Sequence, residues 1–181
     1  MVLIRKLYTS DQDLLTAFFR SLSDETITWQ NHFGKANVDP EALVTGYSEA
    51  IHQPYGYVAI DEIKSTAGPM LEFNVVHTKI VAYGWLTFGE KPEQRFTCSL
   101  GIVVADEYQN KGIGTELTKF MIEEARKLEM RKIFLNCYTT NERAFKLYTK
   151  LGFEIEGIYR KQEWTKDNVA LDLYSMAKFL D

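Results

Sequence analysis

The sequence predicts one α/β (α+β) domain over residues 1–181, with a mixed, mostly antiparallel sheet flanked by about four helices. Strand-like segments follow one another between residues 55 and 104 without a helical stretch, as in an antiparallel meander. Between residues 113 and 151, two stretches with helical spacing alternate with a strand-like run, which is typical of a crossover connection. The chain has 181 residues and is 45% hydrophobic, which is enough to bury one core.

The N-terminal third is expected to start with a strand and a helix. Residues 2–7 read as a short strand. Ser10 or Asp11 can cap a helix whose apolar residues recur at helical spacing, namely Leu14, Leu15, Phe18, Phe19 and Leu22. Residues 23–39 show no sustained period, so no regular element is predicted there. A proline at a first-turn position then predicts a second helix over residues 40–52.

The middle of the chain is expected to form a meander of strands. Strands are predicted over residues 55–63, 71–88 and 95–104, with turns at residues 64–69 and at His77-Thr78. The last of these strands places alternate apolar side chains on one side, namely Phe96, Cys98, Leu100, Ile102 and Val104.

After residue 112 the hydrophobic period becomes that of helices. One helical stripe contains Leu117, Phe120, Met121, Ala125 and Leu128. A second stripe, which Gly152 ends as a C-terminal cap, contains Ala144, Leu147, Tyr148 and Leu151. Residues 132–138 form the strand between the two helices. Residues 153–160 and 169–179 are predicted to close the sheet as an antiparallel pair, joined by a turn at residues 166–168.

Charge and composition restrict the partners of the protein. The net charge of −4, the pI near 5.5 and the lack of a basic block predict no nucleic-acid partner. No run of about eighteen apolar residues and no signal peptide is found, so a cytoplasmic protein without membrane contact is expected. Cys98 and Cys137 lie in apolar strand-like runs, where a small buried hydrophobe is favoured over a disulfide or a nucleophile.

The stretch EYQNKGIGTEL, residues 107–117, joins a strand-like run to a helical one through two glycines. Glycines at such a junction let a ligand approach the backbone closely, and the helix start offers unpaired N–H groups and a positive dipole end. Phosphate is therefore the first ligand to expect. The stretch is not a P-loop because Lys111 precedes Gly112, and Leu117 occupies the last small-residue position of a dinucleotide fingerprint. Taken alone, it is also compatible with a plain glycine turn.

Two motifs of this region occur together in the order and at the distance seen in a known family. VVADEYQNKGIGTEL matches the signature Q/R-x-x-G-x-G/A through Gln109, Gly112 and Gly114. NERAFKLYTKLGFEIEG matches the segment N-x-x-A-x-x-x-Y-x-x-x-G-F through Asn141, Ala144, Tyr148, Gly152 and Phe153. The chain therefore resembles the GNAT superfamily of acyl-CoA-dependent N-acyltransferases. The resemblance is close over residues 98–157 and looser elsewhere.

The resemblance implies acetyl-CoA as the cosubstrate, and no metal. The pyrophosphate would lie on the backbone amides from Gln109 or Asn110 to Thr115. The pantetheine arm would lie along residues 102–104, where the strand over 95–104 splays from the strand over 132–138. The cofactor-binding residues predicted in this way are Ile102, Val103, Val104, Gln109, Asn110, Lys111, Gly112, Ile113, Gly114, Thr115 and Asn141. Asn141 can equally serve as a helix N-cap.

The chemistry that the resemblance implies is direct attack of a neutral primary amine on the thioester. The backbone N–H of Val104, or of Val103 beside it, would polarise the thioester carbonyl. Tyr148 would protonate the departing thiolate, unless it is only a core aromatic. Members that resemble the ribosomal-protein N-terminal acetyltransferases carry a glutamate where this chain has Asn136, and an amide cannot accept the proton. Other candidate bases flank the central strands, although such positions are usually solvated surface: Glu72, His77 and Glu90.

Acceptor specificity is expected in the stretch between the first two helices and in the loop before the last strand. Trp29, His32 and Phe33 could wall a pocket for an amine, or pin a loop as buried aromatics. The predicted function is N-acetylation of a small-molecule amine or a protein N-terminus through a ternary complex. A catalytically weak CoA-binding sensor or complex subunit is the alternative. A homodimer is compatible with the sequence, which determines neither the oligomeric state nor the acyl-chain preference.

Overall fold

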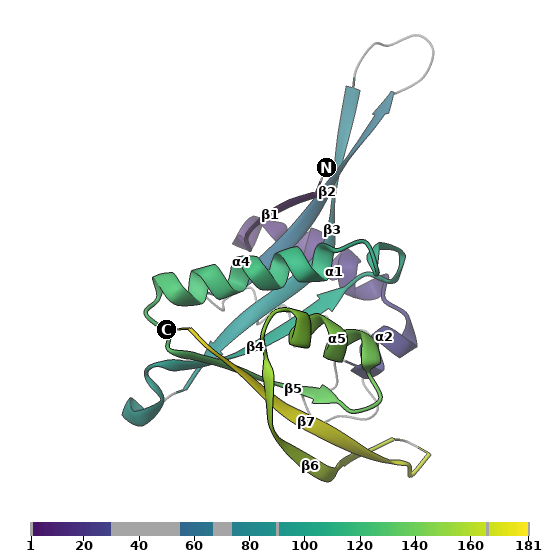
Figure 1. Ribbon diagram of the computed structural model, residues 1–181. Helices are drawn as coiled ribbons and strands as arrows, with labels where there is room; N and C mark the ends of the chain where they lie inside the picture. Colours follow the sequence, from purple (N-terminus) through teal and green to yellow (C-terminus); the bar gives the residue numbers. More distant parts are fainter. Residues whose placement is uncertain (1, 30–54, 67–73, 90, 166, 181) are drawn as a thin grey trace.

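A seven-stranded sheet forms the centre of the protein (Figure 1). The computed structural model describes residues 2–29, 55–66, 74–89, 91–165 and 167–180. The strands are β1 Val2–Lys6, β2 Gly56–Thr66, β3 Asn74–Phe88, β4 Thr97–Val104, β5 Lys132–Tyr138, β6 Glu154–Trp164 and β7 Ala170–Phe179. Their order is β1-β2-β3-β4-β5-β7-β6, and β4 pairs with β5 in parallel while the other described pairs are antiparallel. The predicted mixed, mostly antiparallel sheet is confirmed.

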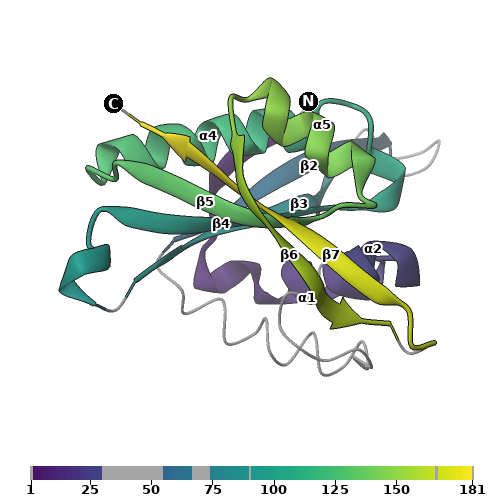
Figure 2. The same cartoon turned by 60° about the horizontal axis from the view of Figure 1, so that its bottom comes forward.

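Helices cover both faces of this sheet (Figure 2). On one face lie α1 Gln12–Arg20 and α2 Asp24–Trp29, and on the other lie α4 Ile113–Lys127 and α5 Glu142–Lys150. The predicted stripe of α1 packs against β2, β3 and β4 through Leu15, Phe18 and Phe19. The stripe of α4 lies in the cluster on the opposite face through Leu117, Met121 and Ala125. Among the described residues, no helix combines the length and the apolar character needed to cross a membrane.

The short helix α2 corrects the expectation that residues 23–39 hold no regular element. Ser23 precedes this helix and caps it, because its hydroxyl accepts the Thr26 N–H at 3.2 Å and its carbonyl accepts the Ile27 N–H at 2.9 Å. A helix of six residues is too short to display a hydrophobic period. Contacts with a distant residue, Asp106, hold its first turn instead. The helix predicted over residues 40–52 lies outside the described residues.

The β2–β3 hairpin corrects the turn predicted at His77-Thr78. Both residues lie within β3, where they pair with Ile63 and Glu62 of β2. The two strands extend beyond the body of the molecule (Figure 1), so backbone pairing continues where the polar sequence predicted a turn. The turn predicted at residues 64–69 is wrong for residues 64–66, which belong to β2. The remaining residues of that turn lie outside the described part of the chain.

The sheet splays between β4 and β5, as the family resemblance predicted. The register between these two strands consists of Thr97 with Lys132, Cys98 with Ile133 and Ser99 with Phe134. By contrast, β4 remains paired with β3 up to its last residue, where Val104 lies opposite Ala82. The C-terminal half of β4 therefore turns one backbone edge toward a gap rather than toward β5. Four of the five residues of the predicted alternation, Cys98, Leu100, Ile102 and Val104, belong to or pack against the hydrophobic cluster that contains Leu117 of α4, whereas Phe96 precedes β4 and is not in this cluster.

A buried carboxylate ties the start of α1 to β1. Asp11 precedes α1, as predicted, and is 4% exposed. Its carboxylate accepts one hydrogen bond from each terminal NH₂ group of Arg5, at 2.7 and 2.8 Å, and one from the Tyr8 N–H at 2.8 Å. The hydrogen bond from Arg5 outweighs the opposing effect of burial, so the pKa of Asp11 lies below its ordinary value of 3.8. The ionised form is the one that stabilises the fold.

Asp11→Asn should lower the free energy of unfolding by about 1–3 kcal/mol at pH 7, because the amide has no negative charge and only one acceptor oxygen for the two N–H groups that the charged Arg5 donates. Since the folded-state pKa is lowered, this contribution is present above the ordinary pKa of 3.8 and is lost as the pH falls through the folded-state value. Urea unfolding from pH 7 to pH 3 should show the two proteins converging at the acid end. The exposed Asp13→Asn variant is the control. A difference that did not depend on pH would contradict this account.

Candidate active site

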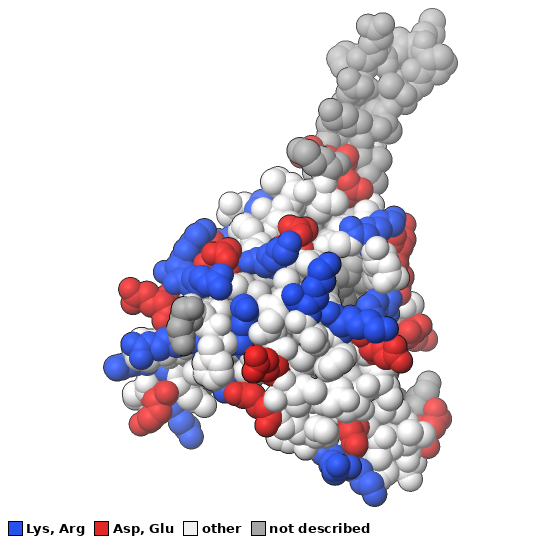
Figure 3. All heavy atoms as spheres, viewed as in Figure 1, with Lys and Arg blue, Asp and Glu red and all other residues white. Residues whose placement is uncertain are grey.

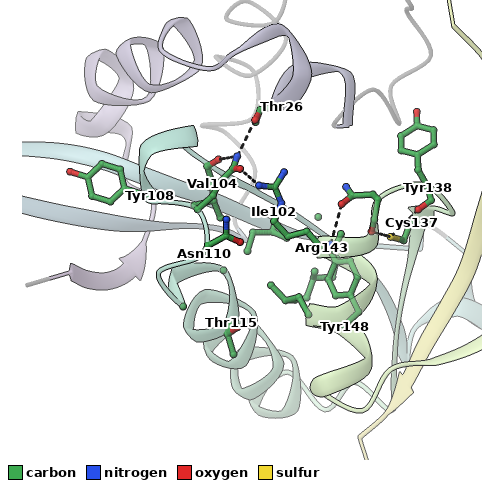
Figure 4. A pocket seen from close by; sticks show the side chains of 18 of the residues that line it. Thr26, Ile102, Val104, Tyr108, Asn110, Thr115, Cys137, Tyr138, Arg143 and Tyr148 are labelled. Carbon is green, nitrogen blue, oxygen red and sulfur yellow. Dashed lines mark hydrogen bonds between the residues drawn. The ribbon is translucent and has the colours of Figure 1, made fainter.

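A cavity of about 330 Å³ opens where β4 and β5 separate. Its walls come from the ends of these two strands, the loop before α4, the first turn of α4 and the first turns of α5 (Figure 4). Many of the residues predicted for the site line it, namely Ile102, Val104, Gln109, Asn110, Gly112, Gly114, Thr115, Asn141 and Tyr148. The two sequence motifs therefore meet at one site.

The remaining predicted residues are placed differently. Val103 is buried in the hydrophobic cluster that contains Phe18 and Phe19 of α1, so it does not line the cavity. Lys111 and Ile113 do not line the cavity either. Lys111 is exposed beside the cavity, with its Nζ 5.1 Å from the centre of the Tyr108 ring. Trp29 ends α2, but its side chain is not described. The positions of His32 and Phe33 lie outside the described residues.

The loop before α4 and the first turn of that helix line the cavity at the helix end, where backbone N–H groups lack a partner within the helix. Asn110 has φ +60° and Gly112 has φ +83°, so the chain turns through left-handed conformations just before the helix. Gly112 occupies the N-cap position of α4. Because glycine has no side chain, it cannot cap the first N–H groups of the helix. Apart from Gly112 and its two chain neighbours, no heavy atom of the described residues lies within 4 Å of the position that a Gly112 Cβ would take. This open, N–H-lined helix start suits an anion.

The two motif glycines are needed for different reasons. Gly112 is needed for its positive φ and for the open space above it. A Cβ on Gly114 would lie 3.1 Å from Leu147 Cδ1 and 3.5 Å from Val104 Cγ2, so this glycine allows α4 to pack closely on α5 and β4. The N–H of Gln109 is already bonded to the Asp106 carbonyl at 3.2 Å. The amides available to a ligand therefore begin after Gln109.

Tyr148 and Asn141 each combine a structural role with a place in the cavity. Tyr148 is 7% exposed, and its ring packs edge-on against Phe153 with centroids 5.6 Å apart. Burial, with a smaller contribution from the nearby Cys137, raises the pKa of Tyr148, so its hydroxyl is protonated at neutral pH. Asn141 accepts the Ala144 N–H at 3.1 Å and is thus the N-cap of α5. The core and N-cap roles predicted from the sequence coexist with positions facing the cavity.

The end of β4 turns its backbone toward the gap at Val104. The Val104 carbonyl accepts a hydrogen bond from Gln109 Nε2 at 3.1 Å, on the side away from β3. The N–H and C=O of one strand residue point to the same side, so the Val104 N–H also faces the gap. Across the gap, Asn136 of β5 lines the cavity and is exposed. His77 lies on the exposed hairpin, and Glu72 and Glu90 lie outside the described residues.

Sequence reasoning missed several side chains of the cavity. Trp85 belongs to β3, and its indole lies against Gly101 of β4 at the cavity. A Cβ on Gly101 would be only 2.1 Å from this indole. A glycine inside a strand signals such a close approach, so Gly101 was a usable clue. Tyr138 lines the cavity and donates its hydroxyl to Glu163 of β6. No local sequence pattern predicts Thr26 of α2 as a cavity residue, because it reaches the cavity only through long-range folding.

Comparisons with known proteins agree on one family. The model of the acetyltransferase (GNAT) family matches residues 23–153. An L-amino acid N-acetyltransferase of Escherichia coli is 30% identical over 100 residues, which are 55% of this chain and 61% of that relative. A spermidine N(1)-acetyltransferase of Escherichia coli is 37% identical over 57 residues, 31% of each chain. The aligned parts thus span less than two thirds of either relative.

The whole fold is shared with solved structures. A GNAT superfamily phosphinothricin acetyltransferase from Sinorhizobium meliloti, in complex with acetyl-CoA, superposes with a TM-score of 0.72. It is 17% identical, and the alignment covers 99% of this chain and 88% of that one. At this identity the likeness concerns the fold.

Proposed function

Because the chain belongs to the acetyltransferase (GNAT) family, we propose that it transfers an acetyl group from acetyl-CoA to a primary amine, either a small molecule or a protein N-terminus. One observation carries this proposal. An N–H-lined helix start at Gly112 and a buried phenol, Tyr148, line one cavity at the splay of β4 and β5. The first can hold phosphate and the second can protonate a thiolate.

In the proposed complex, the pyrophosphate lies on the amides from Asn110 to Thr115. Figure 3 supports this placement, since basic side chains gather around the start of α4 and α5 on that face. Lys111 and Arg143 are the exposed cations closest in sequence to the two helix starts. The pantetheine arm lies along β4 from Ile102 to Val104, adding to the sheet edge that β5 leaves.

The reaction then needs three groups at the gap. The neutral amine attacks the thioester carbon, and the Val104 N–H stabilises the negative charge that develops on the carbonyl oxygen. The carbon–sulfur bond breaks, and Tyr148 gives its proton to the departing thiolate. The ammonium proton leaves through water or through a group outside residues 98–157, because the amide of Asn136 cannot accept it.

The acceptor is tested by measuring free CoA thiol released with a panel of amines. The names of the matched relatives suggest L-amino acids and spermidine as two members, and a peptide with a free N-terminus is the third. Thiol release with one of these supports the enzyme. Tight binding of acetyl-CoA without release of CoA thiol in the presence of any amine would instead favour a CoA-binding sensor or complex subunit. This is the second candidate function, because Asn136 stands where a catalytic glutamate is expected.

Asn136→Ala should lower kcat/KM only modestly, by the loss of one hydrogen bond worth about 0.5–1.5 kcal/mol. A primary amine of pKa near 10 is only about 0.1% neutral at pH 7, so the rate should climb steadily with pH in both proteins. Asn136→Asp is the matched control, since a carboxylate there can add an ionisation to the profile. If Asn136→Ala removes an ionisation from the parent's profile, Asn136 belongs to a proton relay and this account of the base is wrong.

A further inference from the structure

The side chain of Gln109 connects three parts of the molecule that border the cavity. Its Nε2 donates to Thr26 Oγ1 of α2 at 3.0 Å and to the Val104 carbonyl of β4 at 3.1 Å. Its Oε1 accepts a hydrogen bond from Arg143 of α5. Both amide hydrogens and the amide oxygen are therefore engaged. Figure 4 labels the three partners, Thr26, Val104 and Arg143, around the cavity.

The direction of these hydrogen bonds is determined by Asp106. The Thr26 hydroxyl donates to Asp106 Oδ1 at 2.7 Å, so toward Gln109 it can only accept. Gln109 must therefore present its NH₂ group to Thr26, which turns its oxygen toward Arg143. Ser23 holds the same carboxylate through its N–H at 2.9 Å and its hydroxyl at 2.6 Å.

The carboxylate that orders this chain of bonds is ionised. Burial opposes ionisation of Asp106, but the hydrogen bonds from Ser23 and Thr26 outweigh it and lower the pKa of Asp106. An ionised acceptor holds the Thr26 proton firmly, which preserves the polarity of the chain from Asp106 through Thr26 to Gln109. Thr26 itself is 5% exposed, so water competes little for these bonds.

Gln109 stands at the start of the loop that carries the N–H groups. The next residue, Asn110, has φ +60°, and Gly112 opens α4 two residues later. Anchoring the Gln109 side chain to the Val104 carbonyl therefore fixes the start of this loop relative to the end of β4. One of its anchors, Val104, is also the residue whose N–H faces the gap.

We infer that Gln109 is a positioning residue that couples helix α2 to the acetyl-CoA site, so that removing the Thr26 hydroxyl disturbs the loop over residues 110–115. The inference rests on the proposed function for its ligand, though the coupling itself exists without ligand. α2 lies on the opposite face of the sheet from α4 and α5 (Figure 2), so the coupling runs from one face to the other through the splay.

The first test is a double-mutant cycle on acetyl-CoA affinity, measured by calorimetry. Thr26→Val keeps the shape but removes the hydroxyl, and we expect it to weaken binding about three- to tenfold, while Thr26→Ser stays within about twofold of the parent. Gln109→Leu should weaken binding at least as much. Adding Thr26→Val to Gln109→Leu should then have little further effect, because the connection is already broken. Thr149→Val, an exposed threonine of α5, is the control.

Two results would overturn the inference. One is an acetyl-CoA affinity of Thr26→Val within about twofold of the parent, and the other is full additivity of the two changes, which would mean that Thr26 acts on the ligand directly. If Gln109→Leu does not fold, Gln109→Glu takes its place. It keeps the acceptor toward Arg143 but loses both donors, so the same loss of affinity is expected.

The second test separates this inference from the proposed function. Amide hydrogen exchange of residues 110–115 in the ligand-free protein should become faster in Thr26→Val and stay unchanged in Thr26→Ser. Unchanged exchange in Thr26→Val contradicts the coupling even where acetyl-CoA binds. A parent protein that does not bind acetyl-CoA, but shows the faster exchange in Thr26→Val, would refute the proposed ligand and retain the coupling.

Discussion

Tyr148→Phe is expected to lower turnover about 100-fold while changing acetyl-CoA affinity little. The substitution keeps the ring that packs against Phe153, so the local core should persist. It removes the hydroxyl that would protonate the CoA thiolate, and a poorer leaving group slows the breaking of the carbon–sulfur bond. Steady-state kinetics on the best amine of the panel, with calorimetry for acetyl-CoA, separates the two effects.

Tyr174→Phe is the matched control for this prediction. Tyr174 packs against Phe145 of α5, with centroids 5.2 Å apart, and does not line the cavity. Removing the Tyr174 hydroxyl should leave turnover nearly unchanged. If Tyr148→Phe also keeps turnover within about twofold of the parent, Tyr148 is only a core residue.

The pH dependence of the parent protein checks the same assignment. Burial raises the pKa of Tyr148 above its ordinary value of 10.0, so the hydroxyl stays protonated through the neutral and mildly alkaline range. Loss of this proton should therefore cause no falling limb in kcat below pH 10. A falling limb near neutral pH that Tyr148→Phe removes would mean that the phenol titrates there, contrary to its burial.

Gly112→Asp is expected to weaken acetyl-CoA binding tenfold or more, equivalent to about 1.4 kcal/mol or above. Gly112 has φ +83° and faces open space, so a side chain here would occupy the volume proposed for the pyrophosphate. An aspartate also adds a negative charge beside an anion and beside the helix N–H groups that should hold it. Calorimetry with acetyl-CoA measures the change.

Gly112→Asn separates charge from shape. Asparagine and aspartate are similar in size, and both tolerate left-handed backbone conformations better than other side chains. The asparagine variant should therefore lose less affinity, and only the aspartate variant should recover part of its loss at high salt. Unchanged acetyl-CoA affinity in a folded Gly112→Asp protein would show that the pyrophosphate does not bind at this loop.

Local patterns were sufficient for much of the fold. The strand over residues 132–138 and the helical stripes of α1, α4 and α5 follow from periodicity, because each segment buries one face over several turns or alternations. Gly152 ends the second motif's helix with φ +82°, a conformation that favours glycine. The splay of β4 from β5 was predicted through the resemblance of the two motifs to a family, and the observed register confirms it.

Segments held by distant partners could not be predicted in this way. The six residues of α2 carry no period, and the turn expected at His77-Thr78 is overridden by strand pairing in a long hairpin. Trp85 and Arg143 reach the cavity from elements whose sequences do not mark them as site residues. The acceptor residues expected at His32 and Phe33 remain predictions.

The sequence by itself was sufficient to predict the family, which the family model confirms, and to propose a phosphate site at the glycine loop and a proton donor at Tyr148, because these inferences depend on residue types at short, regular spacing. Only the tertiary structure decided how the loop is held. Thr26 meets Asp106 and Gln109 across 80 and 83 residues of chain, and their hydrogen bonds have a direction that no local pattern encodes. A threonine hydroxyl, a carboxylate and an amide become one connected unit only when folding brings α2 to the end of β4 and buries the Thr26 hydroxyl between the other two groups.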